Sequence, residues 1–250
     1  MLRAADFQLL SVQAALFLVD TKSLTQSGFL AAILSKYADR YNGAVQAIPF
    51  SGNAPPEIPR VILQSQDEQW KVQAALNRVD SFWVATETSK RDDGVTRQYS
   101  EVLERYVQMN PSVQIARLGL VISRVVETEN AAQELIDRFC NEASKVQPLN
   151  RSENFEIHNH KMYNLRQTNY AINSWVRCKT GRRTEQPARK VVIVEQDINT
   201  LEDPGNVFTL ESIQSFYQEC QTEMSDILSI YFSRERTYGY RDVTPRHNDQ

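Results

Sequence analysis

The sequence predicts an α+β fold built from two similar βαβββα halves, and three observations lead to this prediction. Each half starts with a long apolar run, at Gln8 to Val19 and at Val113 to Val126. Shorter stretches with alternating apolar residues follow each run, and a stripe of apolar residues at helical spacing closes each half. We therefore expect antiparallel sheets with the long helices packed on one face.

The first half covers residues 1–110 and begins with the strand Gln8 to Val19. The continuous apolar character of this strand favours a central position in a sheet. A helix is expected over about 27–41, because its apolar residues share one stripe and Asn42-Gly43 can end it. Residues 49–59 contain four prolines, which predict a surface loop rather than a paired strand.

A hairpin, a third strand and a helix are expected to complete the first half. The hairpin strands alternate apolar residues over 60–66 and 70–76, and Asp67-Glu68 turns the chain between them. A short strand is expected at Phe82 to Thr86. The apolar residues between Tyr99 and Val107 then follow helical spacing.

The second half covers residues 111–233 and repeats this order of elements. After the strand Val113 to Val126, Thr128 is a suitable N-cap for a helix whose apolar face extends to Cys140. Three strands are expected after this helix, near 155–163, 166–179 and 190–198. Asp197 and Asn199 are expected to shape the turn that follows the last of these strands.

The last helix is the clearest element of the sequence. Thr209 can cap its N-terminus, and Glu211 lies in the first turn, where the helix dipole favours an anion. Apolar residues keep helical spacing from Ile213 to Tyr231. Residues 234–250 lack apolar periodicity and are expected to form a polar tail.

Composition and cysteine usage indicate a soluble, cytoplasmic protein. The 250 residues carry a formal net charge of −3, whereas a dedicated nucleic-acid binder is usually basic overall. The three cysteines are far apart, which disfavours a disulfide framework or a zinc knuckle. Cys140 and Cys220 are expected to be small buried residues. The apolar run near the N-terminus is interrupted by Ser11 and Gln13, so we expect neither a signal peptide nor a membrane span.

One segment is rich in cations and predicts a candidate surface for nucleic acid or an acidic partner. Six cations occur between residues 177 and 190, with Glu185 as the opposing charge within that stretch. Because alternate residues of a strand share a face, Trp175, Arg177 and Lys179 should point the same way. The alternative is a solvated hairpin tip with the tryptophan packed in the core. The candidate residues are Trp175, Arg177, Lys179, Arg182, Arg183, Arg189 and Lys190.

A second candidate is a metal site on His158 and His160. These histidines share one face of a predicted strand, and Asp197 or Glu195 could add a carboxylate ligand. Phe155 and Ile157 point to the opposite face, which favours ordinary surface histidines as the alternative. No surrounding pattern of cysteines or histidines supports a zinc site, so we expect neither a metal nor another cofactor.

Several catalytic signatures are absent from the sequence. It contains no phosphate-binding P-loop, no GxGxxG, no GxSxG and no HExxH motif. No Glu is followed two residues later by Lys, which argues against a restriction-type nuclease core. With three histidines in the chain, a histidine-based triad has few candidates. These observations favour binding over catalysis.

Short motifs along most of the chain resemble a sporadically distributed bacterial family of proteins of roughly this length that has no assigned function. The resemblance implies a strand at the Arg-Leu-Gly motif and an aromatic residue at the end of the last helix. A sporadic distribution is typical of accessory or defence genes. The matching segments are Ile58 to Trp70, Tyr99 to Tyr106, Ile115 to Leu120, Ser123-Arg124, Val192 to Ile198 and Ile230 to Phe232.

Together, these features predict a non-enzymatic interaction protein, within a bacterial accessory or defence operon, whose partner is another protein. Nucleic-acid binding through the basic hairpin is the first alternative. A metal-dependent hydrolase that uses His158, His160 and Asp197 is the second.

Overall fold

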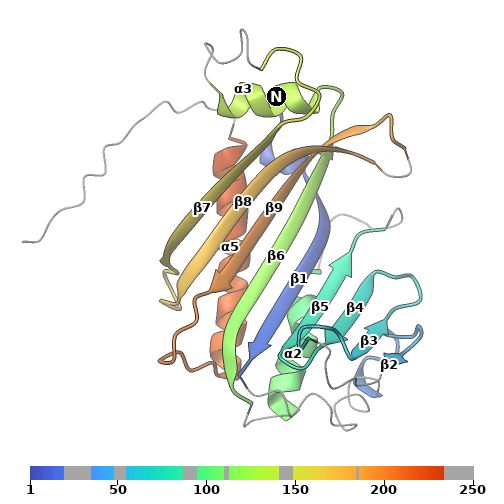
Figure 1. The fold of residues 1–250 in the computed structure, drawn as a ribbon, viewed down its shortest axis with the longest axis vertical. Coiled ribbons are helices and arrows are strands. Elements are labelled where there is room, and N and C mark those ends of the chain that lie inside the picture. The colour runs from blue at the N-terminus through green and yellow to red at the C-terminus, as the bar shows by residue number, and fades with distance from the viewer. Residues whose placement is uncertain are drawn as a thin grey trace, which may run out of the picture.

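A single antiparallel sheet of nine strands organises the part of the chain that the computed structural model describes, in the order β2-β3-β4-β5-β1-β6-β9-β8-β7 (Figure 1). The described residues are 1–19, 35–47, 55–86, 95–109, 113–140, 149–183 and 186–233. The strands are β1 (Gln8–Leu18), β2 (Gln46–Ala47), β3 (Val61–Gln64), β4 (Trp70–Ala74), β5 (Arg78–Val84), β6 (Ile115–Glu127), β7 (Glu156–Asn164), β8 (Ala171–Arg182) and β9 (Lys190–Thr200). The helices are the short η1 (Ala4–Asp6), α2 (Val95–Met109), α3 (Ala131–Phe139) and α5 (Leu210–Tyr231).

The strand order confirms the predicted α+β fold with two similar halves. The first strand of each half, β1 or β6, lies at the centre, and these two strands pair with each other. Next to each lies the last strand of the same half, β5 beside β1 and β9 beside β6. The remaining hairpin strands continue outward, and each half closes with a helix, α2 or α5.

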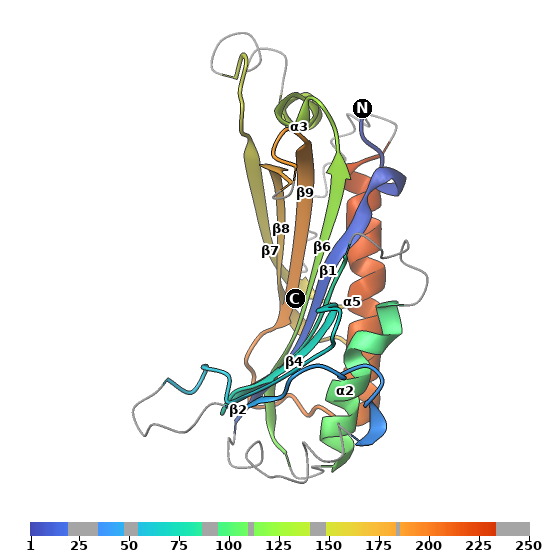
Figure 2. The same ribbon diagram turned by 90° about the vertical axis from the view of Figure 1, so that its right-hand side faces the viewer.

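The described helices pack on one face of this sheet, as Figure 2 shows for α2 and α5. The central strands present Leu16, Leu118 and Leu120 to this face, and all three side chains are fully buried. Tyr99 of α2 and Phe216 of α5 are buried in the same cluster. A second cluster joins α3 to β8, β9 and the C-terminal end of α5. The core is therefore one layer between the sheet and its helices.

The helix termini confirm one predicted cap and correct another. The Thr209 hydroxyl accepts a hydrogen bond from the Ser212 amide at 3.2 Å, as expected for the N-cap of α5. Thr128 was expected to cap α3, but Asn130 holds that position and its side chain makes no capping bond. The amide of Thr128 instead donates to the Lys190 carbonyl at 3.1 Å. This bond keeps the residue attached to the sheet, so the helix begins only at Ala131.

Several strand boundaries differ from the expected ones because sheet pairing accommodates polar residues. β5 begins at Arg78 rather than Phe82, since this segment pairs with both β1 and β4. β8 begins at Ala171, after a turn in which Asn169 has a φ of 56°. The two-residue strand β2 was not predicted, because a pairing this short leaves no periodicity in the sequence.

Some predicted elements fall on residues outside the described part. Most of the helix expected over 27–41 is one of them. Ser35 and Lys36 are helical, but residues 37–41 form a bend and a turn, so the expected end of this helix at Tyr41 is wrong. Residues 234–250 also lie outside the described part. Within the described residues, no helix has both the length and the hydropathy needed to span a bilayer.

The buried hydroxyl of Tyr217 links the last helix to the first strand. It donates to the Ala15 carbonyl at 3.0 Å, and its ring meets Tyr99 edge-on at 6.0 Å between centroids. We expect Tyr217→Phe to lower the free energy of unfolding by about 1 kcal/mol, because the carbonyl loses a buried donor. Chemical denaturation measures this, with Tyr170→Phe as the control, since the Tyr170 hydroxyl makes a long, exposed contact of 3.4 Å. Equal losses in the two variants would contradict the assigned role.

Candidate interaction surface

The face of the sheet opposite the helices presents side chains from both halves of the protein. We call it the open face, because no described helix packs on it (Figure 2). The pairing register brings Gln13, Val121, Asp197, Trp175 and His160 into one row across β1, β6, β9, β8 and β7. Residues far apart in the sequence thus form one continuous surface, which faces the viewer in Figure 1.

In the first half, the open face carries aromatic rings covered by cations. The guanidinium groups of Arg78 and Arg117 each lie 4.5 Å from the centre of the Phe17 ring. Lys71 lies 4.6 Å from the Phe82 ring in the same way. Each contact combines the apolar area of the ring with the attraction between a cation and its π-electrons.

Asp80 anchors this group of residues. Its carboxylate forms an ion pair with Arg78 at 2.7 Å and accepts a hydrogen bond from the Gln13 amide at 2.9 Å. Burial raises the pKa of Asp80 above its ordinary value, and the nearby Arg78 opposes that rise. The charges of Asp80 and Arg78 therefore compensate each other locally.

In the second half, the open face repeats this combination on β7, β8 and β9. The rings of His160 and Trp175 stack with 4.2 Å between their centroids, and Arg177 lies 5.7 Å from the Trp175 ring. Arg177 also forms an ion pair with Glu195 at 2.6 Å. Trp175, Arg177 and Lys179 lie on one face of β8, as the alternation predicted, and the tryptophan is half-buried on the open face.

The four cations at the end of the β8–β9 hairpin share two carboxylates from elsewhere in the chain, so their positive charge is reduced and not cancelled. Glu127 of β6 contacts Arg183 at 3.1 Å and Arg189 at 3.0 Å. Glu153, which precedes β7, contacts Arg182 at 3.5 Å and Lys190 at 3.7 Å. Within this segment of the sequence, Glu185 is the opposing charge. Glu127 and Glu153 could not be identified from the segment itself, because they approach the hairpin only through sheet pairing and chain reversal.

The proposed metal ligands do not come together in the structure. His158 bonds to Glu156 at 2.6 Å, while His160 stacks on Trp175 and bonds to Asn173. Asp197 lies on β9, separated from both histidines by β8. Across the described ranges, no group of three or more His, Cys, Asp or Glu side chains could hold a metal ion.

Asp197 was expected to shape a turn, and this expectation is wrong because β9 continues to Thr200. The side chain lies on the open face, where it accepts a hydrogen bond from Asn199. Burial raises the pKa of the Asp197 carboxyl, while Asn199 and Arg177 act in the opposite direction.

The cysteines do not provide a nucleophile on this surface. Cys178 and Cys220 are buried on the helix side, and burial raises the pKa of the Cys178 thiol to about 12. A thiol with a raised pKa carries little reactive thiolate at neutral pH. Cys140 was expected to be buried but is only half-buried, because it ends α3 as its C-cap residue.

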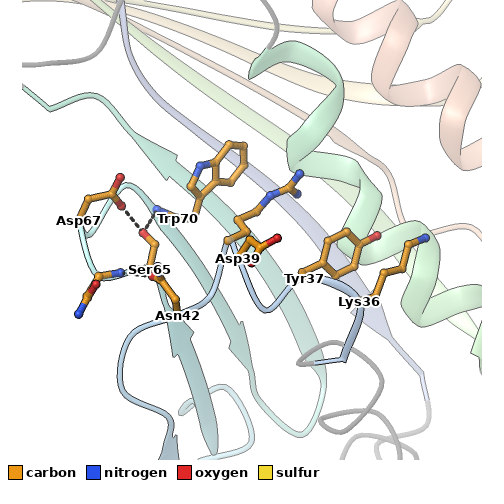
Figure 3. Close-up of a pocket in the computed structure, with 9 residues that line it drawn as sticks. Lys36, Tyr37, Asp39, Asn42, Ser65, Asp67 and Trp70 are labelled. Atoms are coloured by element: carbon orange, nitrogen blue, oxygen red, sulfur yellow. Dashed lines mark hydrogen bonds between the residues drawn. The ribbon is translucent and has the colours of Figure 1, made fainter.

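A cavity of about 570 Å³ lies beside the turn between β3 and β4, and Figure 3 shows the residues that line it. The guanidinium of Arg40 lies 4.7 Å from the Trp70 ring and 5.2 Å from the Tyr37 ring. Arg40 also forms an ion pair with Glu101 of α2 at 3.1 Å. Arg40 therefore holds the segment 35–47 against α2 and against Trp70 of β4.

The chain was also compared with known proteins. No protein-family model and no curated protein sequence matches it. Among solved structures it is similar to a chain described as Methanococcus jannaschii TBP, with 8% identical residues and a TM-score of 0.31. The matched region covers 90% of this chain and 98% of that chain.

The raised pKa of Asp197 predicts a pH-dependent effect of Asp197→Asn. A folded-state pKa above the unfolded value means that stability present at low pH is lost as pH rises through the folded pKa. The asparagine variant does not ionise, so we expect it to be more stable than the wild type at neutral pH. The difference should shrink as pH falls through the acid range. Urea denaturation across pH measures it, and a difference that grows toward acid pH would contradict the prediction.

Proposed function

We propose that this chain is a non-enzymatic binding protein that holds another protein on its open face. One observation carries the proposal: the open face combines aromatic rings, arginines and carboxylates over both halves of the sheet, and one arginine in each half forms an ion pair with a carboxylate. Protein interfaces are enriched in Arg and aromatic residues, and the residues that dominate their binding energy are often Trp, Tyr and Arg.

The charge pairing favours a protein over a phosphate backbone as the partner. Arg78 and Arg177 are bound to Asp80 and Glu195, and the cations of the hairpin are bound to Glu127 and Glu153. A nucleic-acid surface generally presents surplus positive charge that replaces counterions along the backbone. The setting we propose is the bacterial cytoplasm, within an accessory or defence operon, in line with the family resemblance.

Site-specific crosslinking in the native cell tests this function. A photo-reactive amino acid replaces Lys179, on the open face, or Gln218, which is exposed on α5 on the other side of the sheet layer. We expect a discrete crosslinked protein from the first position that is absent from the second. A combined Phe17→Ala and Trp175→Ala change should remove this product, because it truncates an aromatic ring in each half.

Circular dichroism checks that the double variant keeps its fold. The proposal is wrong if both positions give the same products, or if the folded double variant retains the crosslink.

Nucleic-acid binding is the second candidate, favoured by the shared face of Trp175, Arg177 and Lys179. In this case, retention of single-stranded DNA or RNA should fall steeply with salt, and Arg182→Glu with Arg183→Glu should weaken it for all sequences. Removing the opposing carboxylates by Glu127→Gln and Glu153→Gln should strengthen binding, because four paired cations become available. Filter binding at low salt measures both effects, and no retention by any variant excludes this candidate.

A further inference from the structure

β7 is an edge strand whose outer side pairs with no described strand. All nine of its residues pair with β8 in an unbroken register, and β8 lies on one side of it only. Its counterpart in the first half, β3, has four residues and is covered by β2. Exposed edges in native proteins are usually short, bulged, interrupted by proline or lined with charged side chains, because free N–H and C=O groups invite pairing. β7 is long and regular and contains no proline, and its charged side chains are Glu156 near one end and Lys161 near the middle.

Apolar groups remain uncovered on both sides of this edge. On the helix side, a cavity of about 510 Å³ lies between β7 and α5, and Tyr163, Ile227 and Ile230 are among its lining residues. Ile230 is 72% exposed. On the open face, Met162 is 62% exposed. The edge therefore combines free backbone groups with accessible apolar surface.

We propose that β7 pairs with β7 of a second copy of this chain, antiparallel and centred on His160. His160 is the middle residue of the strand, so this register lets all nine residues pair. On the helix side, Ile157 then lies opposite the partner's Tyr163, and Asn159 lies opposite the partner's Lys161. Because the pairing is two-fold symmetric, each of these contacts forms twice.

The same register is complementary on the open face. Glu156 lies opposite the partner's Asn164, and His158 lies opposite the partner's Met162. His160 lies opposite the partner's His160, and within each chain the His160 ring is stacked on Trp175. Neither Glu156 nor Lys161 meets a like charge, whereas a register centred on Lys161 would place two ammonium groups face to face. The strand can thus pair with itself without opposing the charges of Glu156 or Lys161 to like charges, and it sets Ile157 against the partner's Tyr163.

The dimer would join two nine-stranded sheets into one continuous sheet with both open faces on the same side. This inference does not depend on what the open face binds. The dimer would present two copies of any binding surface side by side, so that a repeated or symmetric partner could engage both copies at once.

Cysteine crosslinking of the full chain tests the register. In a Cys140→Ser background, which removes the half-buried thiol, His160→Cys should give an intermolecular disulfide under mild oxidation, because the two residues face each other across the axis. Met162→Cys alone should not, since it faces the partner's His158. A mixture of the separate His158→Cys and Met162→Cys chains should crosslink to each other.

Analytical ultracentrifugation tests the association itself. We expect a dimer for the wild type and a dissociation constant raised roughly tenfold for His160→Glu, which places like charges opposite each other. Gln64→Glu on β3, at the other end of the sheet, is the matched control and should leave the dimer unchanged. A wild-type chain that sediments as a monomer at all concentrations overturns the proposal. So does a dimer that His160→Glu leaves intact and that His160→Cys fails to crosslink.

Discussion

The antiparallel pairing of β1 with β6 is the contact on which the rest of this structure depends. It joins the two halves into one sheet, and every other strand is added outward from this pair. The helix-facing side chains of both strands are apolar and fully buried at Leu16, Leu118 and Leu120. Burying apolar side chains is the main favourable contribution to folding, so this pairing and the helix layer stabilise each other. The bond from Tyr217 to Ala15 ties the last helix to the same strands.

With all described helices on one side, the other side of the sheet must satisfy different physical requirements. Its side chains cannot be purely apolar without exposing a large patch to water, and isolated charges beside aromatic rings would lose hydration. The structure meets both requirements. Cations lie over aromatic rings, as at Phe17, and cations form ion pairs with carboxylates, as at Asp80 and Glu195. The result is a surface with mixed chemistry, on which part of the positive charge is compensated by carboxylates.

Part of this candidate surface could be predicted from the sequence. The period of two along β8 placed Trp175, Arg177 and Lys179 on one face, and the structure confirms it. Phe17, Arg78 and Arg117 were not identified, because they come from three strands whose adjacency depends on the sheet order. The charge of the basic hairpin was overestimated for the same reason, since Glu127 and Glu153 are distant in sequence from most of the cations they bind. Asp197 was assigned to a turn because the polar residues at the end of β9 resemble a loop when their strand partners are unknown.

The sequence by itself determined the α+β class, the doubled order of the strands with a closing helix in each half, and the faces of α2 and α5, because hydrophobic periodicity reports which side chains must be buried. It also determined the Thr209 cap, which depends on a local hydrogen bond. Only the tertiary structure decided that the two halves share one sheet, which residues meet on the open face, and that β7 is left as a long unpaired edge within the described residues. These features depend on pairings between residues far apart in the chain, and local periodicity carries no information about which strands become neighbours.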